Sequence, residues 1–387
     1  MRRAGGAAAV IKVLYLVDTM ICAGTQTHIA NMVRGHDRGR FTPGLLCLQE
    51  KGPLGERLEA EGYPVGALGL DRIYGPAAAR ACARYVARLR REAIDVVHAY
   101  LFSAQVFGVP PARLAGVPLV LAGRRAVGAY WTARKYRIAR RFSNAFAHLH
   151  VGNSAAVRDY VVGEEGVPPS RVRIVYNGVD AERFSPPDGG RGGRGSVTVG
   201  YIGSLTRVKG VDILLRAARR AVASFPRLRV RIVGDGPPPA RRADEGDTDE
   251  RLKALAGELG IAGAVEFAGG TELVEEELRR MDIFVMPSIS EGMSNAVLEA
   301  MASGLPVVAS GSGGNLEVVG DGATGFLFPV GDDAALAGRI AALARDARMR
   351  GAMGEAGRRR VLERFTVGRM VSEMEALYLE GLGGRGR

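Results

Sequence analysis

Short apolar runs alternate with longer stretches of helical periodicity along most of this chain. The runs Val10–Val17 and Val96–His98 are typical of buried strands, and Pro76–Glu92 is typical of a helix. Strands that alternate with helices in this way form parallel sheets covered by helices on both faces. The pattern therefore predicts an α/β protein made of doubly wound, Rossmann-like domains.

The chain has 387 residues, more than one hydrophobic core usually holds, so two domains are expected. Residues 185–195 are rich in Pro and Gly and form neither regular element well, which indicates a linker. We expect a first domain over 1–184, a second over 185–366, and a C-terminal helix within 367–387 that returns to the first domain. Ligands would bind where the strands end, facing an interdomain cleft.

Composition favours a globular protein of a reducing compartment. Hydrophobic residues make up 47% and charged residues 24% of the chain, and its three cysteines are scattered. Lys12 lies within the first apolar run and Asp18 directly follows it, which favours a strand over a signal peptide. No run of about 18 apolar residues is present, so no membrane span is expected. The expected location is cytoplasmic, with peripheral attachment to the inner membrane face as an option.

Positive charge is concentrated in one part of the first half. The net charge is 53 − 41 = +12, and no acid occurs between Val96 and Arg158. The basic stretch 113–141 interleaves cations with apolar residues such as Ile138 and Phe142 at roughly helical spacing. Such a helix can bind an anionic membrane surface or an anionic substrate, or can simply be a basic solvent face. Nucleic acid is not the expected partner.

Four loops of the second half follow expected strands and can bind anions. The segment 203–210 begins at Gly203 and carries two cations, Arg207 and Lys209, which suit phosphate. A tight turn at 234–237 and a Gly-rich loop at 311–317 follow two other strands. Residues 237–250 resemble a surface insertion. Several such loops at successive strand ends of one domain indicate a ligand site.

The fourth loop, at 291–299, is the most informative segment of the chain. Glu291 follows an apolar run, and Glu299 lies within the next helix-forming run. Between them Gly292 permits a close backbone approach, and the N–H groups of Met293, Ser294 and Asn295 open a helix, where an anion is favoured. Two acids around a phosphate-sized site would suit a sugar, a diphosphate and a ribose in that order.

Together these segments resemble the second domain of the retaining nucleotide-sugar glycosyltransferases of family 4, which have the two-domain GT-B fold. The resemblance is close over about 171–330 and includes the motif Glu-Gly-Met-Ser-Asn-Ala-Val-Leu-Glu at 291–299. The first half matches in layout only, at 23–28 and 95–98. Ser204 stands where many relatives carry arginine, and 122–125 lacks the histidine common there.

The resemblance implies a role for each matching position. Glu291 would contact the transferred sugar, Arg207 and Lys209 would neutralise the diphosphate, and Glu299 would hold the ribose. Donor binding would also involve the backbone at Gly24, Gly203, Gly292, Met293, Ser294 and Asn295. His98 and Arg125 would face the acceptor. No metal is expected, because the sequence has no visible cluster of metal ligands, and the nucleotide sugar is a substrate and not a cofactor.

The expected activity is transfer of a sugar, with retention of configuration, from a UDP- or GDP-sugar to a glycan or lipid-linked acceptor. Cell-surface polysaccharide or glycolipid synthesis would use such a reaction. Two alternatives remain open: a non-catalytic nucleotide-sugar-binding scaffold subunit, and a nucleotide-sugar epimerase on the same fold.

Overall fold

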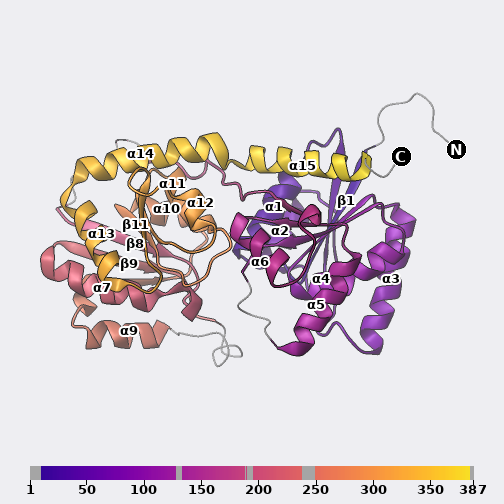
Figure 1. Ribbon diagram of the computed structural model, residues 1–387, viewed down its shortest axis with the longest axis horizontal. Coiled ribbons are helices and arrows are strands. Elements are labelled where there is room, and N and C mark those ends of the chain that lie inside the picture. Colours follow the sequence, from indigo (N-terminus) through magenta and orange to yellow (C-terminus); the bar gives the residue numbers. More distant parts are fainter. Residues whose placement is uncertain (1–9, 128–132, 188, 190–194, 238–248, 384–387) are drawn as a thin grey trace. The chain divides into compact units, whose positions relative to one another are not determined.

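The computed structural model describes residues 10–127, 133–187, 189, 195–237 and 249–383 (Figure 1). The chain divides into two compact units. One contains the residues up to Asn177 together with those from Val367 onward, and the other is Gly178–Thr366. Each unit is built on a parallel sheet flanked by helices. The predicted α/β class with two doubly wound domains is therefore confirmed.

The first unit contains a seven-stranded sheet in the order β3-β2-β1-β4-β5-β6-β7, with every neighbouring pair parallel. Its strands are β1 Ile11–Val17, β2 Phe41–Cys47, β3 Val65–Ala67, β4 Val96–Tyr100, β5 Leu119–Arg124, β6 Leu149–Gly152 and β7 Val172–Ile174. Its α-helices are α1 Gly24–Gly35, α2 Gly52–Ala60, α3 Pro76–Glu92, α4 Phe102–Leu114, α5 Arg134–Phe146, α6 Ala155–Gly163 and α15 Val367–Gly383, and a 3₁₀ turn, η1, covers Pro169–Arg171.

The alternation of side chains along β1 shows how both faces of this sheet are buried. Tyr15 belongs to a core that also includes residues of α1 and α15, such as Met374. Leu14 and Leu16 belong to a second core that includes residues of α3 and α4. Because both faces are covered, β1 is an almost continuous apolar run and not an alternating one. Helix α15, the last described element of the chain, thus packs on the first sheet (Figure 1).

Helix α4 is an element that the apolar pattern did not predict. Its residues 102–114 include Pro110 and Pro111, which usually end a helix because they lack N–H donors. The preceding Leu101 adopts a positive φ of 67°. Burial of Phe107 and Ala112 in the core shows that packing outweighs the unfavourable local preference.

The second unit contains a six-stranded parallel sheet in the order β10-β9-β8-β11-β12-β13. Its strands are β8 Val197–Ile202, β9 Leu228–Val233, β10 Val265–Gly269, β11 Ile283–Met286, β12 Val307–Ser310 and β13 Gly325–Phe328. Its α-helices are α7 Val211–Ser224, α9 Asp249–Glu258, α10 Val274–Arg279, α11 Asn295–Ala302, α12 Asn315–Val318, α13 Asp333–Arg345 and α14 Ala347–Arg364, with 3₁₀ turns η2 Arg207–Lys209 and η4 Ala262–Ala264.

The division between the units falls before the segment 185–195 that the composition indicated as a linker. Val179 N donates to the carbonyl oxygen of Phe365 at 2.9 Å, and Arg358 donates to the carbonyl oxygen of Phe184 at 3.1 Å. Phe184 is also buried. These contacts hold residues 178–184 in the second unit, and a local excess of Pro and Gly does not reveal them.

Some sequence expectations fall outside the described ranges. They concern residues 188 and 190–194 of the linker, most of the 237–250 insertion, and two aromatic residues of the basic stretch, Tyr130 and Trp131. Among the helices that are described, none combines the length and the hydropathy needed to cross a bilayer.

Candidate functional site

Three loops meet at the carboxyl end of the second sheet. They follow β8, β11 and β12, which are adjacent in the sheet although β8 and β11 are not consecutive strands of the chain. Ile289 N donates to the carbonyl oxygen of Val208 at 2.8 Å, joining the first two loops. Gly314 N donates to the carbonyl oxygen of Gly292 at 2.7 Å, joining the third. The backbone thus holds 207–210, 287–294 and 311–314 as one assembly.

Lys209 and Glu291 form an ion pair within this assembly. Lys209 Nζ lies 2.7 Å from Glu291 Oε2, and the two side chains are 24% and 12% exposed. The hydroxyl of the buried Ser288 donates to the same carboxylate oxygen at 3.2 Å. A partly desolvated pair of this kind presents a cation and a carboxylate side by side. The sequence proposed both residues, and the tertiary structure brings them together.

Glycine is required where these loops approach most closely. Gly313 has a φ of +55°, and a β-carbon there would overlap the carbonyl oxygen of Glu291. Gly210 has a φ of +66°, and a β-carbon there would overlap the carbonyl oxygen of Pro287. Both positions combine a left-handed backbone with contact to another loop, so glycine alone fits without rearrangement.

Gly203 lies where the loops after β8 and β9 cross. A β-carbon at Gly234 would overlap the carbonyl oxygen of Gly203, and Leu205 N donates to the carbonyl oxygen of Asp235 at 2.9 Å. The hydroxyl of the buried Tyr201 donates to the carbonyl oxygen of Ser204 at 2.8 Å. Burial, with a smaller effect of Glu291, raises the pKa of Tyr201 well above its ordinary value. The Tyr201 side chain is therefore neutral, and its hydrogen bond to Ser204 supports the loop after β8.

The loop that carries Glu291 continues into α11. Ser294 is the N-cap residue, and its hydroxyl accepts from Val297 N at 3.4 Å. Gly292, Met293 and Ser294 are buried, whereas Asn295 is half-buried. The capping serine explains why the helix begins here. The positive end of the helix dipole therefore lies within four residues of Glu291.

Glu299 lies one turn along α11 and has a different environment from Glu291. Burial raises the pKa of its carboxyl to about 7, while Arg183 opposes the rise and Glu275 adds to it. Arg183 Nη2 is itself paired with Glu275 at 2.7 Å. Glu299 is thus a carboxyl whose protonation changes near neutral pH. Arg183 was not a site residue in the sequence analysis, because only the fold places it near Glu299.

Arg207 occupies the same 3₁₀ turn as Lys209 and is exposed. Its position agrees with the expected cationic loop, whereas the ion pair to Glu291 is made by Lys209. Among the described residues, no group of three or more His, Cys, Asp or Glu side chains is arranged to hold a metal ion.

The first unit carries the remaining predicted residues, and one assignment needs correction. His98 is fully buried on β4, where its Nδ1 lies 2.8 Å from the hydroxyl oxygen of Tyr378. Burial, with Arg125 and His36 contributing, lowers its pKa to about 3. His98 is therefore a neutral core residue, and in this structure it is not exposed to an acceptor as the sequence analysis expected. The sequence placed His98 at the end of a strand, and that position does not reveal that α15 covers this face of β4.

Arg125 and Gly24 remain accessible in part. Arg125 follows β5, is half-buried, and donates to the side-chain oxygen of Asn177. Burial lowers its pKa to about 10, so it is cationic at neutral pH. Gly24 is exposed at the first position of α1. Arg125 directly follows β5, and Gly24 follows the loop after β1. Both therefore lie at the carboxyl end of the first sheet.

A buried network of tyrosine and histidine side chains was not anticipated. Tyr15 on β1 lies 2.7 Å from His36 Nε2 and 3.2 Å from the hydroxyl of Tyr378. His36 Nδ1 in turn lies 2.9 Å from Glu375 on α15. At the other end, His28 Nε2 lies 3.1 Å from the Tyr100 hydroxyl. The network ties α15 to the interior of the first sheet.

Models of known protein families match both units of the chain. The family model for glycosyl transferases group 1 matches residues 193–360, and that for glycosyltransferase family 4 matches residues 23–183. D-inositol 3-phosphate glycosyltransferase of Acidothermus cellulolyticus is 33% identical over 60% of this chain, which spans 57% of the relative's length. Putative glycosyltransferase EpsF of Bacillus subtilis is 27% identical over 78% of the chain and 79% of its own length.

A solved structure has the same fold throughout. Anabaena HepE in complex with UDP and glucose superposes with a TM-score of 0.82 at 21% identity, over 95% of this chain and 99% of that one. With both sheets, the motif at 291–299 and the two family models in agreement, the chain belongs to the family 4 glycosyltransferases of GT-B fold.

Proposed function

We propose that this protein is a retaining glycosyltransferase that moves a sugar from a nucleoside diphosphate sugar to a glycan or lipid-linked acceptor. The observation that carries the proposal is the 2.7 Å pair between Lys209 and Glu291. It lies beside the start of α11 and at the junction of three loops. A cation, a helix N-terminus and a carboxylate within one small region suit a diphosphate joined to a sugar.

In the proposed reaction the bond between the sugar's anomeric carbon and the diphosphate oxygen breaks. Negative charge then develops on that oxygen, and Lys209 and Arg207 stabilise it together with the start of α11. The acceptor oxygen bonds to the anomeric carbon on the same face, and its proton passes to the departing phosphate. Glu291 accepts hydrogen bonds from the sugar hydroxyls and so positions the sugar. This sequence of events needs no protein nucleophile.

Donor binding extends along α11 in this proposal. Gly292, Met293, Ser294 and Asn295 lie against the phosphates, and Glu299 accepts hydrogen bonds from the ribose hydroxyls. Gly203, where a β-carbon would meet the Tyr201 hydroxyl, contributes its backbone to donor binding in this proposal. Donor binding at Gly24 and acceptor binding at Arg125 extend the proposal to the first unit. The pair between Lys209 and Glu291 holds both side chains in position for the donor.

The relatives support the choice of donor class. HepE was crystallised with UDP and glucose, as well as with UDP-glucose. The Acidothermus relative is named for transfer of a sugar to an inositol phosphate. We therefore propose a UDP- or GDP-sugar as the donor, with no metal ion or other cofactor.

Calorimetric titration of the purified protein with UDP, GDP and ADP tests the donor class. We expect selective binding of one nucleotide, weakened by Glu299→Ala and unchanged by Glu258→Ala, which removes an exposed acid of α9. Absence of binding to all three nucleotides, and to their common sugar conjugates, would overturn the proposal.

Transfer to acceptor mixtures, followed by proton NMR of the anomeric signal, tests the reaction. Retained configuration is expected in the wild type, and Glu291→Ala should abolish transfer while nucleotide binding persists. Nucleotide binding without transfer or donor hydrolysis would favour the scaffold alternative. Conversion of the donor sugar without any acceptor would favour the epimerase.

A further inference from the structure

The outer face of α5 on the first unit combines exposed cations with exposed apolar side chains. Ile138 and Phe142 are 59% and 58% exposed, an unusual degree for residues of this kind. They lie four residues apart, so they share one side of the helix. We use the name α5 face for the exposed residues Arg134, Lys135, Arg137, Ile138, Arg141 and Phe142.

Helical geometry places the cations of the α5 face around its apolar centre. At 100° per residue, Arg134, Arg137 and Arg141 lie on one side of Ile138 and Phe142, and Lys135 lies on the other. Within the described ranges Arg134, Arg137 and Arg141 form no salt bridge. No acid occurs between Val96 and Arg158 to neutralise them. The face therefore presents apolar groups bordered by positive charge.

The opposite side of α5 is held by an ion pair. This ion pair involves Arg140, which therefore differs from the exposed cations of the α5 face. Arg140 Nη1 pairs with the buried Glu165 at 2.8 Å, and Glu165 also pairs with Arg124. Asn144 donates to the same carboxylate at 2.9 Å. The basic stretch thus contains two kinds of residue: Arg124 and Arg140 hold the helix in place, and the cations of the α5 face point outward.

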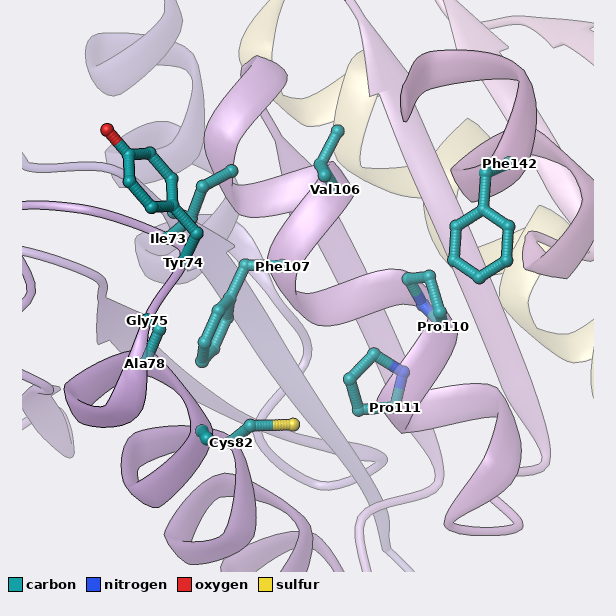
Figure 2. Close-up of a pocket in the computed structure, with 11 residues that line it drawn as sticks. Ile73, Tyr74, Gly75, Ala78, Cys82, Val106, Phe107, Pro110, Pro111 and Phe142 are labelled. Atoms are coloured by element: carbon teal, nitrogen blue, oxygen red, sulfur yellow. The ribbon is translucent and has the colours of Figure 1, made fainter. Parts of the chain in front are cut away.

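An open apolar groove adjoins this face. Figure 2 shows Phe142 of α5 and Pro110 and Pro111 of α4 on one side, with Tyr74 on the other. Phe107 is buried, whereas Tyr74 is 68% exposed. The groove has a volume of about 350 Å³. Leu114, one turn beyond Pro110 on α4, is 73% exposed. Exposed apolar side chains that gather beside a groove are a feature of interaction sites.

We propose that the α5 face and this groove dock the first unit on a bilayer that contains anionic phospholipids. Ile138 and Phe142 enter the boundary between headgroups and acyl chains, and the four cations contact lipid phosphates. The groove beside Phe142 receives apolar lipid groups. Charge complementarity selects this occupant, because a net-positive rim with an apolar centre matches an anionic, apolar interface. The inference does not depend on the proposed reaction.

Vesicle co-sedimentation tests the electrostatic part of this proposal. Vesicles of phosphatidylcholine with phosphatidylglycerol should bind the wild type, and pure phosphatidylcholine should bind it much less. The variant Arg134→Gln, Lys135→Gln, Arg137→Gln, Arg141→Gln should bind the mixed vesicles on the order of 100-fold more weakly.

The matched control removes the same charge from the second unit. The variant Arg216→Gln, Arg219→Gln, Arg227→Gln, Arg348→Gln changes four exposed cations there. Its binding should fall no more than about threefold, because only long-range, screened attraction is lost. Equal losses in the two variants would mean that net charge alone attracts the protein, and would overturn the docking surface.

The apolar part is tested at high salt, where charge attraction is screened. Ile138→Ser with Phe142→Ser should remove most of the remaining binding, whereas Leu362→Ser, at an exposed position of α14, should not. Unchanged binding by the double variant would overturn the proposal. So would a wild-type dimer in light scattering that the double variant converts to monomer, because the face would then belong to a second copy of the chain.

Discussion

The Tyr378 hydroxyl of α15 lies 2.8 Å from Nδ1 of His98 on β4, across 280 residues of chain. Both side chains are fully buried, and burial keeps the histidine neutral by lowering its pKa. A hydroxyl and one nitrogen of a neutral imidazole can share a hydrogen bond here without a buried charge. The contact explains how the last described helix becomes part of the first unit's interior.

Tyr378→Phe should destabilise the first unit by about 1–3 kcal/mol, because His98 and Tyr15 lose a buried partner that water does not replace. Urea unfolding followed by circular dichroism measures the loss. Tyr74→Phe, which removes an exposed hydroxyl, is the control and should leave the unfolding midpoint unchanged. Equal midpoints for wild type and Tyr378→Phe would show that the network adds no stability.

Lys209→Gln should weaken binding of the nucleoside diphosphate and reduce transfer by about 100-fold or more, because the developing phosphate charge loses a cation. Transfer rate and calorimetric affinity are both measured. Arg220→Gln, on α7, removes an exposed cation paired with Asp333 and is the control. A Lys209→Gln enzyme with ordinary turnover would exclude this lysine from the clamp.

Nucleotide affinity should depend on the protonation of Glu299. Its pKa of about 7 is raised by burial, so the folded protein holds the proton below that pH and releases it above. Ribose binding by the carboxylate should therefore strengthen by about tenfold from pH 6 to pH 8. Titrations of wild type and Glu299→Gln separate this effect from titration of the nucleotide phosphate, which both proteins share. The same pH dependence in both would rule out Glu299 as its source.

Gly313→Ala should lower both stability and transfer. Its backbone is left-handed, and the added β-carbon overlaps the carbonyl oxygen of Glu291, so the two loops must separate. A loss of about 1–3 kcal/mol is expected, with a fall in kcat as Glu291 moves. Gly338→Ala, on α13, meets no neighbouring atom and should keep wild-type activity. Full activity of Gly313→Ala would show that this contact does not position Glu291.

Glu165→Gln should destabilise the first unit by about 3–5 kcal/mol, because Arg124 and Arg140 would keep their charges without a buried anion to pair with. Thermal unfolding checks the loss. Glu59→Gln removes an acid from a more exposed pair with Lys51 and should change stability by less than about 1 kcal/mol. Similar losses in both variants would mean that the Glu165 cluster is no stronger than a surface pair.

Much of the fold and of the second-unit site could be predicted because their signals are local. Runs such as Val10–Val17 are apolar because parallel strands are buried on both faces. The segment 291–299 follows β11 and enters α11, so its two acids and its anion-binding start lie within one strand-to-helix junction. The order of residues along a short segment is enough to predict such a site.

Tertiary structure decided every relationship between distant segments. Lys209 and Glu291 are 82 residues apart and meet because β8 and β11 are neighbours in the sheet. His98 is buried because α15 covers its face of β4, and Arg140 is not a surface cation because Glu165 binds it. Burial and pairing depend on what packs against a side chain. The sequence determined which residues could ionise, cap a helix or form a helix. Packing determined which of those residues remain available to a ligand.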